Sequence, residues 1–232
     1  MSKPVCVILG VGPGNGMSIA RKFAAEGYAV ALCARRGAEM EKAASEIPGS
    51  KGYAFDVTDT DGAAALFAAI ETDLGPVETL VYNAGSGAWG TVDDLAPEDL
   101  LQNCNVNAVG LMAATKAALP ALRVNKGKIL VIGASAALRG RPASIAFAAG
   151  KAAQRSVAQS LARQLGPEGI HVAYLVLDGM IDLETTKARM PDKPDMFFLS
   201  ADGIADATWA LAAQDPQAWT FELDLRPFAE NW

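Results

Sequence analysis

Residues 9–16 read LGVGPGNG, and they lie between a short apolar run, Val5–Leu9, and a segment with helical spacing, Gly16–Glu26. Glycines at such a junction let the backbone turn tightly and approach a pyrophosphate at the N-terminus of a helix. The pattern G-x-G-x-x-G fails, because Asn15 stands in the place of its third glycine. The alternative pattern G-x-x-x-G-x-G is met at Gly10, Gly14 and Gly16. The stretch therefore predicts a dinucleotide-binding turn, with a purely structural glycine turn as the alternative.

Short apolar runs alternate with longer helical segments along the chain. The predicted strands are Val5–Leu9, Val30–Ala34, Lys51–Phe55, Val77–Tyr82, Lys128–Ile132 and His171–Leu177. The predicted helices are Gly16–Glu26, Ala38–Ile47, Asp59–Asp73, Glu98–Leu122 and Ser144–Leu165. Apolar strands separated by helices are typical of a parallel sheet covered on both faces. We therefore expect an α/β fold, a single-domain Rossmann-type doubly wound parallel sheet flanked by helices and spanning residues 1–232.

The least regular segment is Leu183–Leu199, which contains Pro191 and Pro194. It lies late in the chain, where we expect a substrate flap. A final strand is predicted at Trp219–Leu225 and is ended by Pro227. We find no repeat or linker that would mark a second domain.

The composition excludes several classes of protein. The 232 residues are 51% hydrophobic and 20% charged, which favours a large core over disorder. A net charge of -6 disfavours a nucleic-acid partner. No apolar run reaches the roughly 18 residues of a membrane span. Three scattered cysteines, Cys6, Cys33 and Cys104, suggest no disulfide framework and favour a reduced, cytoplasmic compartment.

Further motifs follow the predicted strands or lie on the predicted helices. They are Asp56-Val57, Tyr82-Asn83-Ala84-Gly85, Val106-Asn107, Lys151 and Asp178-Gly179. Their order and spacing, together with the glycine turn, resemble the short-chain dehydrogenase/reductase family over nearly the whole chain. The resemblance implies a nicotinamide-dependent oxidoreductase that acts on a small molecule, with no metal site.

The resemblance also assigns roles to individual residues. It implies that Asp56 meets the adenine, that Lys151 hydrogen-bonds the nicotinamide ribose, and that Asn107 supports Lys151 through water. The implied cofactor-binding residues are Gly10, Gly14, Asn15, Gly16, Arg35, Asp56, Val57, Asn83, Ala84, Gly85, Lys151, Gly179 and Ile181. Considered alone, Lys151 is an ordinary helical lysine and Asn107 a helix-bend residue.

Two positions depart from the family's active site. Its catalytic tyrosine, four residues before the lysine, is here Phe147, whose ring neither donates nor accepts a proton. Its catalytic serine, thirteen residues earlier, is Ala134. Ser135 is adjacent, but we expect its side chain to point elsewhere, because side chains alternate along a strand. The resemblance thus describes a divergent member in which Asn107 and Lys151 remain.

Cofactor choice is predicted from the end of the second strand. A site that prefers NAD usually carries an acid there, but this chain has Ala34 followed by Arg35. A guanidinium binds a 2′-phosphate through charge-assisted hydrogen bonds. We therefore expect NADP(H) to be favoured over NAD(H), with a solvated loop at Arg35 and Arg36 as the alternative.

The remaining polar candidates are more often structural. His171, the only histidine, enters a strand, and no catalytic triad can be built around it. Asp178 and Asp182 fall near the expected nicotinamide site, but for both a loop-capping or solvated role is the alternative to a catalytic one. The proton that the missing tyrosine would donate could come from Asp182 or from water. Substrate identity cannot be predicted from Leu183–Leu199.

Three functional hypotheses remain. The first is an NADP(H)-dependent oxidoreductase that transfers hydride to a small carbonyl or imine with atypical proton donation. The second is a non-catalytic NADP-binding pseudoenzyme that acts as a redox sensor or partner subunit. The third, an inherited and empty glycine turn, leaves Asp56 and Arg35 without a role. Apolar residues on several faces of Ala108–Leu122 and Ala152–Leu165 predict a homodimer or homotetramer, as the resemblance also implies.

Overall fold

Seven strands form one parallel sheet in the order β3-β2-β1-β4-β5-β6-β7 in the computed structural model, which describes residues 3–229. The strands are β1 (Val5–Leu9), β2 (Ala29–Ala34), β3 (Ser50–Ala54), β4 (Val77–Tyr82), β5 (Lys128–Ile132), β6 (His171–Leu177) and β7 (Glu222–Leu225). The strand order reverses between β1 and β4, so ligands are expected beyond the carboxyl ends of these two strands. The predicted doubly wound sheet is confirmed. The first two and last three residues of the expected domain lie outside the described range.

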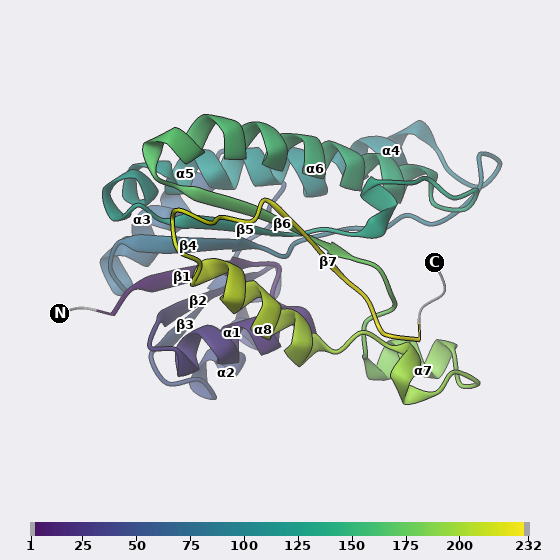
Figure 1. Cartoon of the computed structure of the whole chain (residues 1–232), viewed down its shortest axis with the longest axis horizontal. Coiled ribbons are helices and arrows are strands. Elements are labelled where there is room, and N and C mark those ends of the chain that lie inside the picture. Colours follow the sequence, from purple (N-terminus) through teal and green to yellow (C-terminus); the bar gives the residue numbers. More distant parts are fainter. Residues whose placement is uncertain (1–2, 230–232) are drawn as a thin grey trace.

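Helices cover both faces of the sheet (Figure 1). One face carries α3 (Ala63–Asp73), α4 (Pro97–Cys104), α5 (Gly110–Asn125) and α6 (Ile145–Leu165), and the other carries α1 (Asn15–Ala25), α2 (Gly37–Ser45) and α8 (Ala201–Ala212). A short helix, α7 (Glu184–Arg189), lies beyond the carboxyl end of the sheet. None of the helices in residues 3–229 is long and apolar enough to cross a membrane.

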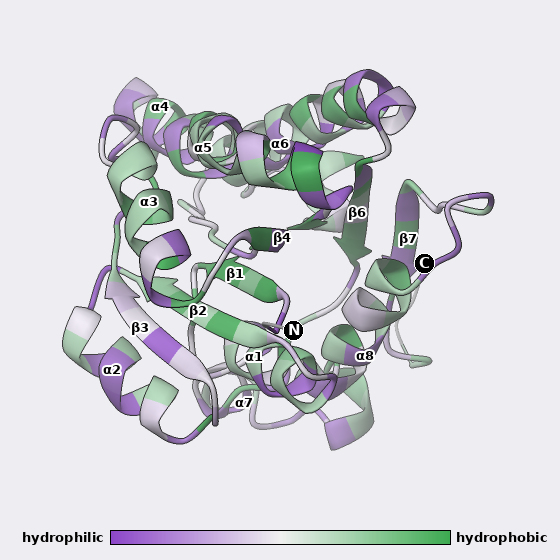
Figure 2. Ribbon diagram, turned by 90° about the vertical axis from the view of Figure 1, so that its left-hand side faces the viewer, coloured by the Kyte–Doolittle hydropathy of each residue, from purple (hydrophilic) through white to green (hydrophobic). Residues whose placement is uncertain are grey.

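The core forms two layers, one on each side of the sheet. Every residue of β1 and β6 is buried, as expected for central parallel strands that are covered on both faces. The coloured ribbon shows these strands as a hydrophobic layer between helices that carry polar residues outward (Figure 2). The edge strand β3 is only partly buried, and β7 at the other edge is similar.

Two predicted helices differ from those observed by more than two residues or by an interruption, whereas the other three agree to within two residues at each end. The helix predicted at Asp59–Asp73 begins at Ala63. The Asp59 carboxylate accepts a hydrogen bond from the Gly62 backbone N–H at 2.9 Å, and this local turn competes with helix formation. The helix predicted at Glu98–Leu122 is divided by a π-helical turn at residues 105–109.

The π-helical turn has a partner on the sheet. The Tyr82 hydroxyl, at the end of β4, donates a hydrogen bond to the Val106 carbonyl within this turn. Tyr82 is fully buried. A wider turn changes which backbone groups pair inside the helix, and a side chain from the sheet satisfies one of them. No helical periodicity in the sequence signals this irregularity.

The C-terminal third contains two further corrections. Helix α8 was not predicted, although the Ser200 side chain caps it by accepting a hydrogen bond from the Gly203 N–H at 3.1 Å. The strand predicted at Trp219–Leu225 is limited to Glu222–Leu225. The segment Leu183–Leu199, predicted to be irregular, contains α7 and a short 3₁₀ turn.

Candidate active site

The glycine turn connects β1 to α1, and its shape explains which glycines the sequence requires. Gly10 has a φ of +87°, and a Cβ there would lie 2.4 Å from the Cα of Ala84. A Cβ at Gly16 would lie 2.7 Å from the Cα of Val11. A Cβ at Gly12 would meet nothing within 4 Å. Gly10 and Gly16 are therefore needed for close backbone packing, whereas Gly12 is not.

Asn83 holds this turn against the next strand. Its Nδ2 donates to the Gly10 carbonyl at 2.6 Å, and its backbone N–H donates to Leu9 at 2.9 Å. Asn83 lines two cavities, which therefore meet at this residue. The first cavity, of about 600 Å³, lies beyond β1, β2 and β4, and its lining includes Gly10, Ala34, Arg35, Asp56, Val57, Asn83, Ala84 and Gly85.

Arg35 and Asp56 lie at the outer end of this first cavity. Arg35 is exposed, and its side chain has no hydrogen bond or salt bridge to another residue in the range 3–229, whereas Arg36 pairs with Glu39 at 2.9 Å. Asp56 accepts hydrogen bonds from the Thr58 N–H and hydroxyl at 2.9 and 2.8 Å. The Thr58 N–H chiefly lowers the Asp56 pKa, with a further contribution from the charge of Arg35. The carboxylate is thus held in place and ionised.

The second cavity, of about 570 Å³, lies beyond β5 and β6. Its lining includes Asn15, Asn83, Trp89, Ala134, Ser135, Arg139, Arg141, Phe147, Lys151, Asp178, Gly179, Met180, Ile181, Leu183, Thr186, Met190 and Phe197. Phe147 and Lys151 are one turn apart on α6, so both side chains face the cavity. Residues of Leu183–Leu199 form part of the opposite wall.

The Lys151 ammonium is almost completely buried. Its Nζ donates to the Ile132 carbonyl at 3.1 Å and to Oε1 of Gln154 at 3.0 Å. Burial away from water disfavours the charged form and lowers the pKa of Lys151 to about 7. Gln154 was not predicted, although its position three residues after Lys151 on the same helix was the available signal.

Asn107 lies on the π-helical turn, next to Lys151. Its Nδ2 donates to the carbonyls of Asn103 at 2.9 Å and Ser86 at 3.3 Å. Its Oδ1 is buried and has no hydrogen-bond partner within the described chain. A Cβ at Gly85 would lie 3.4 Å from Lys151 Nζ and 3.5 Å from this Oδ1. The two polar atoms therefore flank the same small space.

Trp89 is a site residue that sequence reasoning missed. Its ring lies on that of Phe147, with centroids 4.6 Å apart and planes inclined by 35°. A Cβ at Gly87 would lie 2.8 Å from Trp89 Nε1 and 3.3 Å from the Phe147 ring. The absence of a side chain at Gly87 thus permits the pair of rings. The sequence signal was weak, because a loop tryptophan has many possible roles.

Ala134 and Ser135 follow β5, which ends at Ile132. Ala134 lines the cavity, as the predicted replacement of the serine requires. The alternation argument for Ser135 does not apply, because β5 has already ended and Ser135 starts a 3₁₀ turn; Ser135 lines the cavity beside Ala134. The alternation of side chains applies only within a strand.

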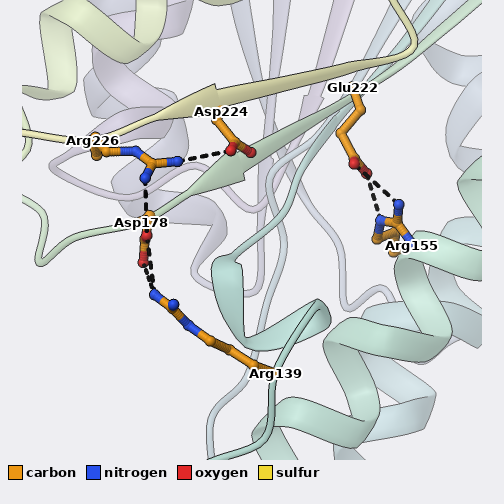
Figure 3. Close-up of polar contacts among 6 residues, drawn as sticks. All are labelled: Arg139, Arg155, Asp178, Glu222, Asp224 and Arg226. Atoms are coloured by element: carbon orange, nitrogen blue, oxygen red, sulfur yellow. Dashed lines mark hydrogen bonds and ion pairs between the residues drawn. The ribbon is translucent and has the colours of Figure 1, made fainter. Parts of the chain in front are cut away.

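Asp178 lies at the carboxyl end of β6, between two arginines (Figure 3). Its carboxylate oxygens accept hydrogen bonds from Arg139 Nη2 at 3.3 and 3.2 Å. Arg226 Nη1 lies 3.9 Å away, and Arg226 Nη2 contacts Asp224 at 2.8 Å. Gly179, beside this cluster, has no room for a Cβ because Pro227 would lie 2.8 Å from it. The cluster joins the cavity wall to β7 and the segment after it.

The other polar residues considered from the sequence have structural partners of their own or lie outside the two cavities. His171 stacks on Trp219, with centroids 4.8 Å apart, and its Nε2 contacts the Thr220 carbonyl at 2.9 Å. Asp182 forms a salt bridge with Lys187 at 3.0 Å. The three cysteines are free thiols, and no group of three or more potential metal ligands exists within residues 3–229.

The residues present fit a dinucleotide. The first cavity offers an ionised carboxylate and an unpaired guanidinium, and the glycine turn leaves backbone groups open at the N-terminus of α1. Asn15, in the first turn of α1, lines the second cavity, and its buried Oδ1 has no hydrogen-bond partner among residues 3–229. Such orphaned polar atoms are rare in proteins unless a ligand or water completes them.

The fold and the site define a dinucleotide-binding α/β protein. Comparison with known families assigns it further: the short chain dehydrogenase model matches residues 4–194, and the chain belongs to this family of oxidoreductases. The 3-oxoacyl-[acyl-carrier-protein] reductase MabA of Mycobacterium tuberculosis is 33% identical over 183 residues, 78% of this chain and 71% of MabA.

Two other proteins are informative. The inactive 2-(S)-hydroxypropyl-CoM dehydrogenase 2 of Xanthobacter autotrophicus is 38% identical over 156 residues, 66% of this chain and 68% of that protein. The alcohol dehydrogenase of Thermococcus sibiricus, complexed with 5-hydroxy-NADP, superposes with a TM-score of 0.89 at 26% identity and covers 99% of both chains.

Proposed function

We propose that this protein is an NADP(H)-dependent oxidoreductase that reduces a small carbonyl compound or imine. The observation that carries the proposal is that Lys151, Phe147 and Ala134 all line the second cavity, which meets the first cavity at Asn83. Such a junction lets a ligand in one cavity react with a ligand in the other. MabA is named as a reductase, and the protein of Thermococcus sibiricus is named as a dehydrogenase.

The residues that would hold the cofactor are those implied by the family. Gly10, Gly14, Asn15 and Gly16 would surround the pyrophosphate, Asp56 and Val57 would meet the adenine, and Lys151 would bind the nicotinamide ribose. Of the other implied residues, Asn83, Ala84 and Gly85 line the first cavity, and Gly179 and Ile181 line the second. Arg35 would bind a 2′-phosphate, which supports NADP(H) over NAD(H). The structure of the archaeal relative contains an NADP derivative.

The absence of the family's tyrosine and serine removes only part of the reduction in the activation barrier that such a site can provide. Positioning alone supplies roughly 7–11 kcal/mol of barrier reduction. A general acid contributes about 10²–10⁴-fold, on the order of 3–5.5 kcal/mol. Activated ketones and protonated imines need less help from such an acid. Turnover on these substrates therefore survives the replacement of the tyrosine by Phe147.

Lys151 is our proposed proton source. A bound nicotinamide cofactor would supply the hydride there, and Lys151 Nζ holds a proton at the same cavity. With a pKa of about 7, the buried ammonium releases that proton much more readily than an ordinary lysine. Asp182 is less suitable than the sequence suggested, because its carboxylate is paired with Lys187 at 3.0 Å.

A second candidate function is a non-catalytic NADP-binding protein. The stacked rings of Trp89 and Phe147 favour it, since they place an apolar surface where a proton donor is expected. One relative carries the word inactive in its name. This candidate predicts ordinary cofactor affinity without turnover.

NADPH consumption with a panel of activated ketones and cyclic imines tests the two candidates. The oxidoreductase is expected to oxidise NADPH with at least one compound, and Lys151→Ala is expected to reduce that rate. A protein that binds NADPH but consumes none of it with any compound would instead support the non-catalytic candidate. Lys116→Ala, an exposed lysine on α5, is the control for loss of charge.

We also propose that the chain works as a cytoplasmic homodimer or homotetramer and as a single domain whose segment 183–199 covers the substrate. Exposed apolar side chains on α4, the π-helical turn and α5 support assembly; they are Leu101, Val109, Met112 and Val124. Light scattering at micromolar concentration tests it: a strictly monomeric mass would contradict the proposal, and Met112→Asp is expected to reduce the mass of an oligomer.

A further inference from the structure

The charges around the second cavity do not balance. Arg139 is neutralised by Asp178, to which it donates two hydrogen bonds at 3.3 and 3.2 Å. Arg226 is neutralised by Asp224 at 2.8 Å (Figure 3). Asp178, the acidic residue in the cavity lining, is therefore already paired. Arg141 also lines it, and no carboxylate in the described chain pairs with its guanidinium.

The backbone of Arg141 is fixed at the entrance to α6. Its N–H donates to Ser144 Oγ at 2.9 Å, and that hydroxyl returns a hydrogen bond to the Arg141 carbonyl at 3.1 Å. Ser144 is only 2% exposed and immediately precedes α6, which carries Phe147 and Lys151. The backbone from which the Arg141 side chain extends is therefore anchored next to α6.

Arg141 is exposed at the edge of this cavity, so its guanidinium is accessible to a ligand as well as to solvent. Arg35 is likewise exposed in the lining of the first cavity, where the proposed ligand is a phosphate. Most of the remaining wall of the second cavity is apolar, from residues such as Trp89, Phe147, Met180, Ile181, Leu183 and Phe197. The lining thus suits a ligand with an apolar body and one anionic end.

We propose that the second cavity takes a carbonyl compound bearing one small anionic group, a carboxylate, sulfonate or phosphonate, which Arg141 binds. This proposal rests on the oxidoreductase function. It places the carbonyl beside Lys151 and Phe147 and the anion at Arg141, so Arg141 sets substrate choice without taking part in the chemistry. Its planar fork of donors matches such an anion through two parallel hydrogen bonds.

Matched pairs of probes test the proposal. We would measure NADPH oxidation with 4-oxopentanoate and with its neutral ethyl ester, and then with homologues that carry one to four methylenes between carbonyl and carboxylate. The acid is expected to have the lower KM at its best length. Arg141→Gln is expected to raise that KM about 10-fold or more, as for a charged hydrogen bond, and to leave the ester unchanged. Arg163→Gln, an exposed arginine on α6 outside the cavity, is the matched control.

The same variants are titrated by calorimetry in the presence of NADPH, which gives a readout independent of turnover. 2-Oxopropanesulfonate and 2-oxopropylphosphonate are included to distinguish the anions. Binding of an acid that Arg141→Gln weakens and Arg163→Gln does not would support the anion site even if no NADPH were consumed, and only the oxidoreductase function would then fail. Equal KM or affinity for acid and ester, unaffected by Arg141→Gln, or no binding of any anion, would overturn the proposal.

Discussion

The Trp89 ring covers the Phe147 ring at the point where α6 faces the second cavity, with a centroid separation of 4.6 Å. Trp89 is 63% exposed, so the pair lies at the mouth of the cavity rather than in the core. A phenol at position 147 would have the same ring and would still pack under Trp89. The site is thus shaped for an aromatic residue but lacks its hydroxyl.

The first prediction concerns this hydroxyl. Phe147→Tyr combined with Ala134→Ser is expected to raise NADPH-dependent reduction of simple ketones by about 10²-fold or more, the contribution of a general acid. Lys151 would lower the pKa of the new phenol by charge proximity. Phe147→Leu is the control, because it changes the ring without adding a donor. If the double variant gains nothing on simple ketones, the natural substrate needs no donor or the site is not a reductase site.

The second prediction concerns the cofactor. Arg35 is expected to make NADPH bind more tightly than NADH by about 1.5–3 kcal/mol, as for a charged hydrogen bond. Arg35→Ala is expected to remove that difference, while Arg36→Ala, whose guanidinium already pairs with Glu39, should change it little. Fluorescence titration with both cofactors measures it. Unchanged NADPH binding in Arg35→Ala would contradict the assignment.

The third prediction follows from the low pKa of Lys151. Burial lowers that pKa to about 7 in the folded protein, whereas the unfolded chain keeps a value near 10.4. Between these values the unfolded chain binds more protons, so this group makes the free energy of unfolding rise with pH. Lys151→Met is therefore expected to be more stable than the wild type at pH 7, by on the order of 2–4 kcal/mol.

Urea unfolding at several pH values between 7 and 10 measures this effect. The stability difference between Lys151→Met and the wild type should shrink as pH rises toward 10. Lys116→Met, which replaces an exposed lysine on α5, is expected to show no such trend. A constant difference for Lys151→Met across this range would show that the ammonium is not desolvated in the folded protein.

The fourth prediction concerns the glycine turn. Gly10→Ala combines a positive φ with a Cβ placed 2.4 Å from the Ala84 backbone, so it is expected to destabilise the fold by about 2 kcal/mol or more. Gly12→Ala meets nothing within 4 Å and is expected to stay within about 0.5 kcal/mol of the wild type. Urea unfolding of both variants provides the comparison, and equal losses would refute the assigned packing.

Much of this architecture could be predicted from the sequence because β1, β4, β5 and β6 are mostly apolar and are bounded by turns. Their predicted bounds agree with the structure. The glycine turn likewise has a local cause, since the steric need for Gly10 and Gly16 is independent of the rest of the fold. Helix α8 was missed because its apolar residues face the sheet and α1 through an alanine-rich surface with few large side chains.

The site was less predictable, because its remaining features depend on contacts between distant segments. The Tyr82–Val106 hydrogen bond joins β4 to the π-helical turn, and no pattern around either residue indicates it. The charge balance of the second cavity also required the structure. Arg139 and Arg141 are near neighbours in sequence, but within the described part of the chain only Arg139 pairs with a carboxylate. Sequence spacing alone treats the two arginines alike.

Leu183 begins the segment 183–199, which lines part of the second cavity, yet a Cβ at Gly14 would lie only 2.6 Å from the Leu183 Cδ2. The loop expected to select the substrate therefore also touches the turn expected to hold the cofactor. For protein engineering, residues 183–199 are consequently not an exchangeable module. A graft from a relative with another specificity would have to retain a side chain at position 183 that fits over Gly14, or the new specificity would be accompanied by altered cofactor affinity.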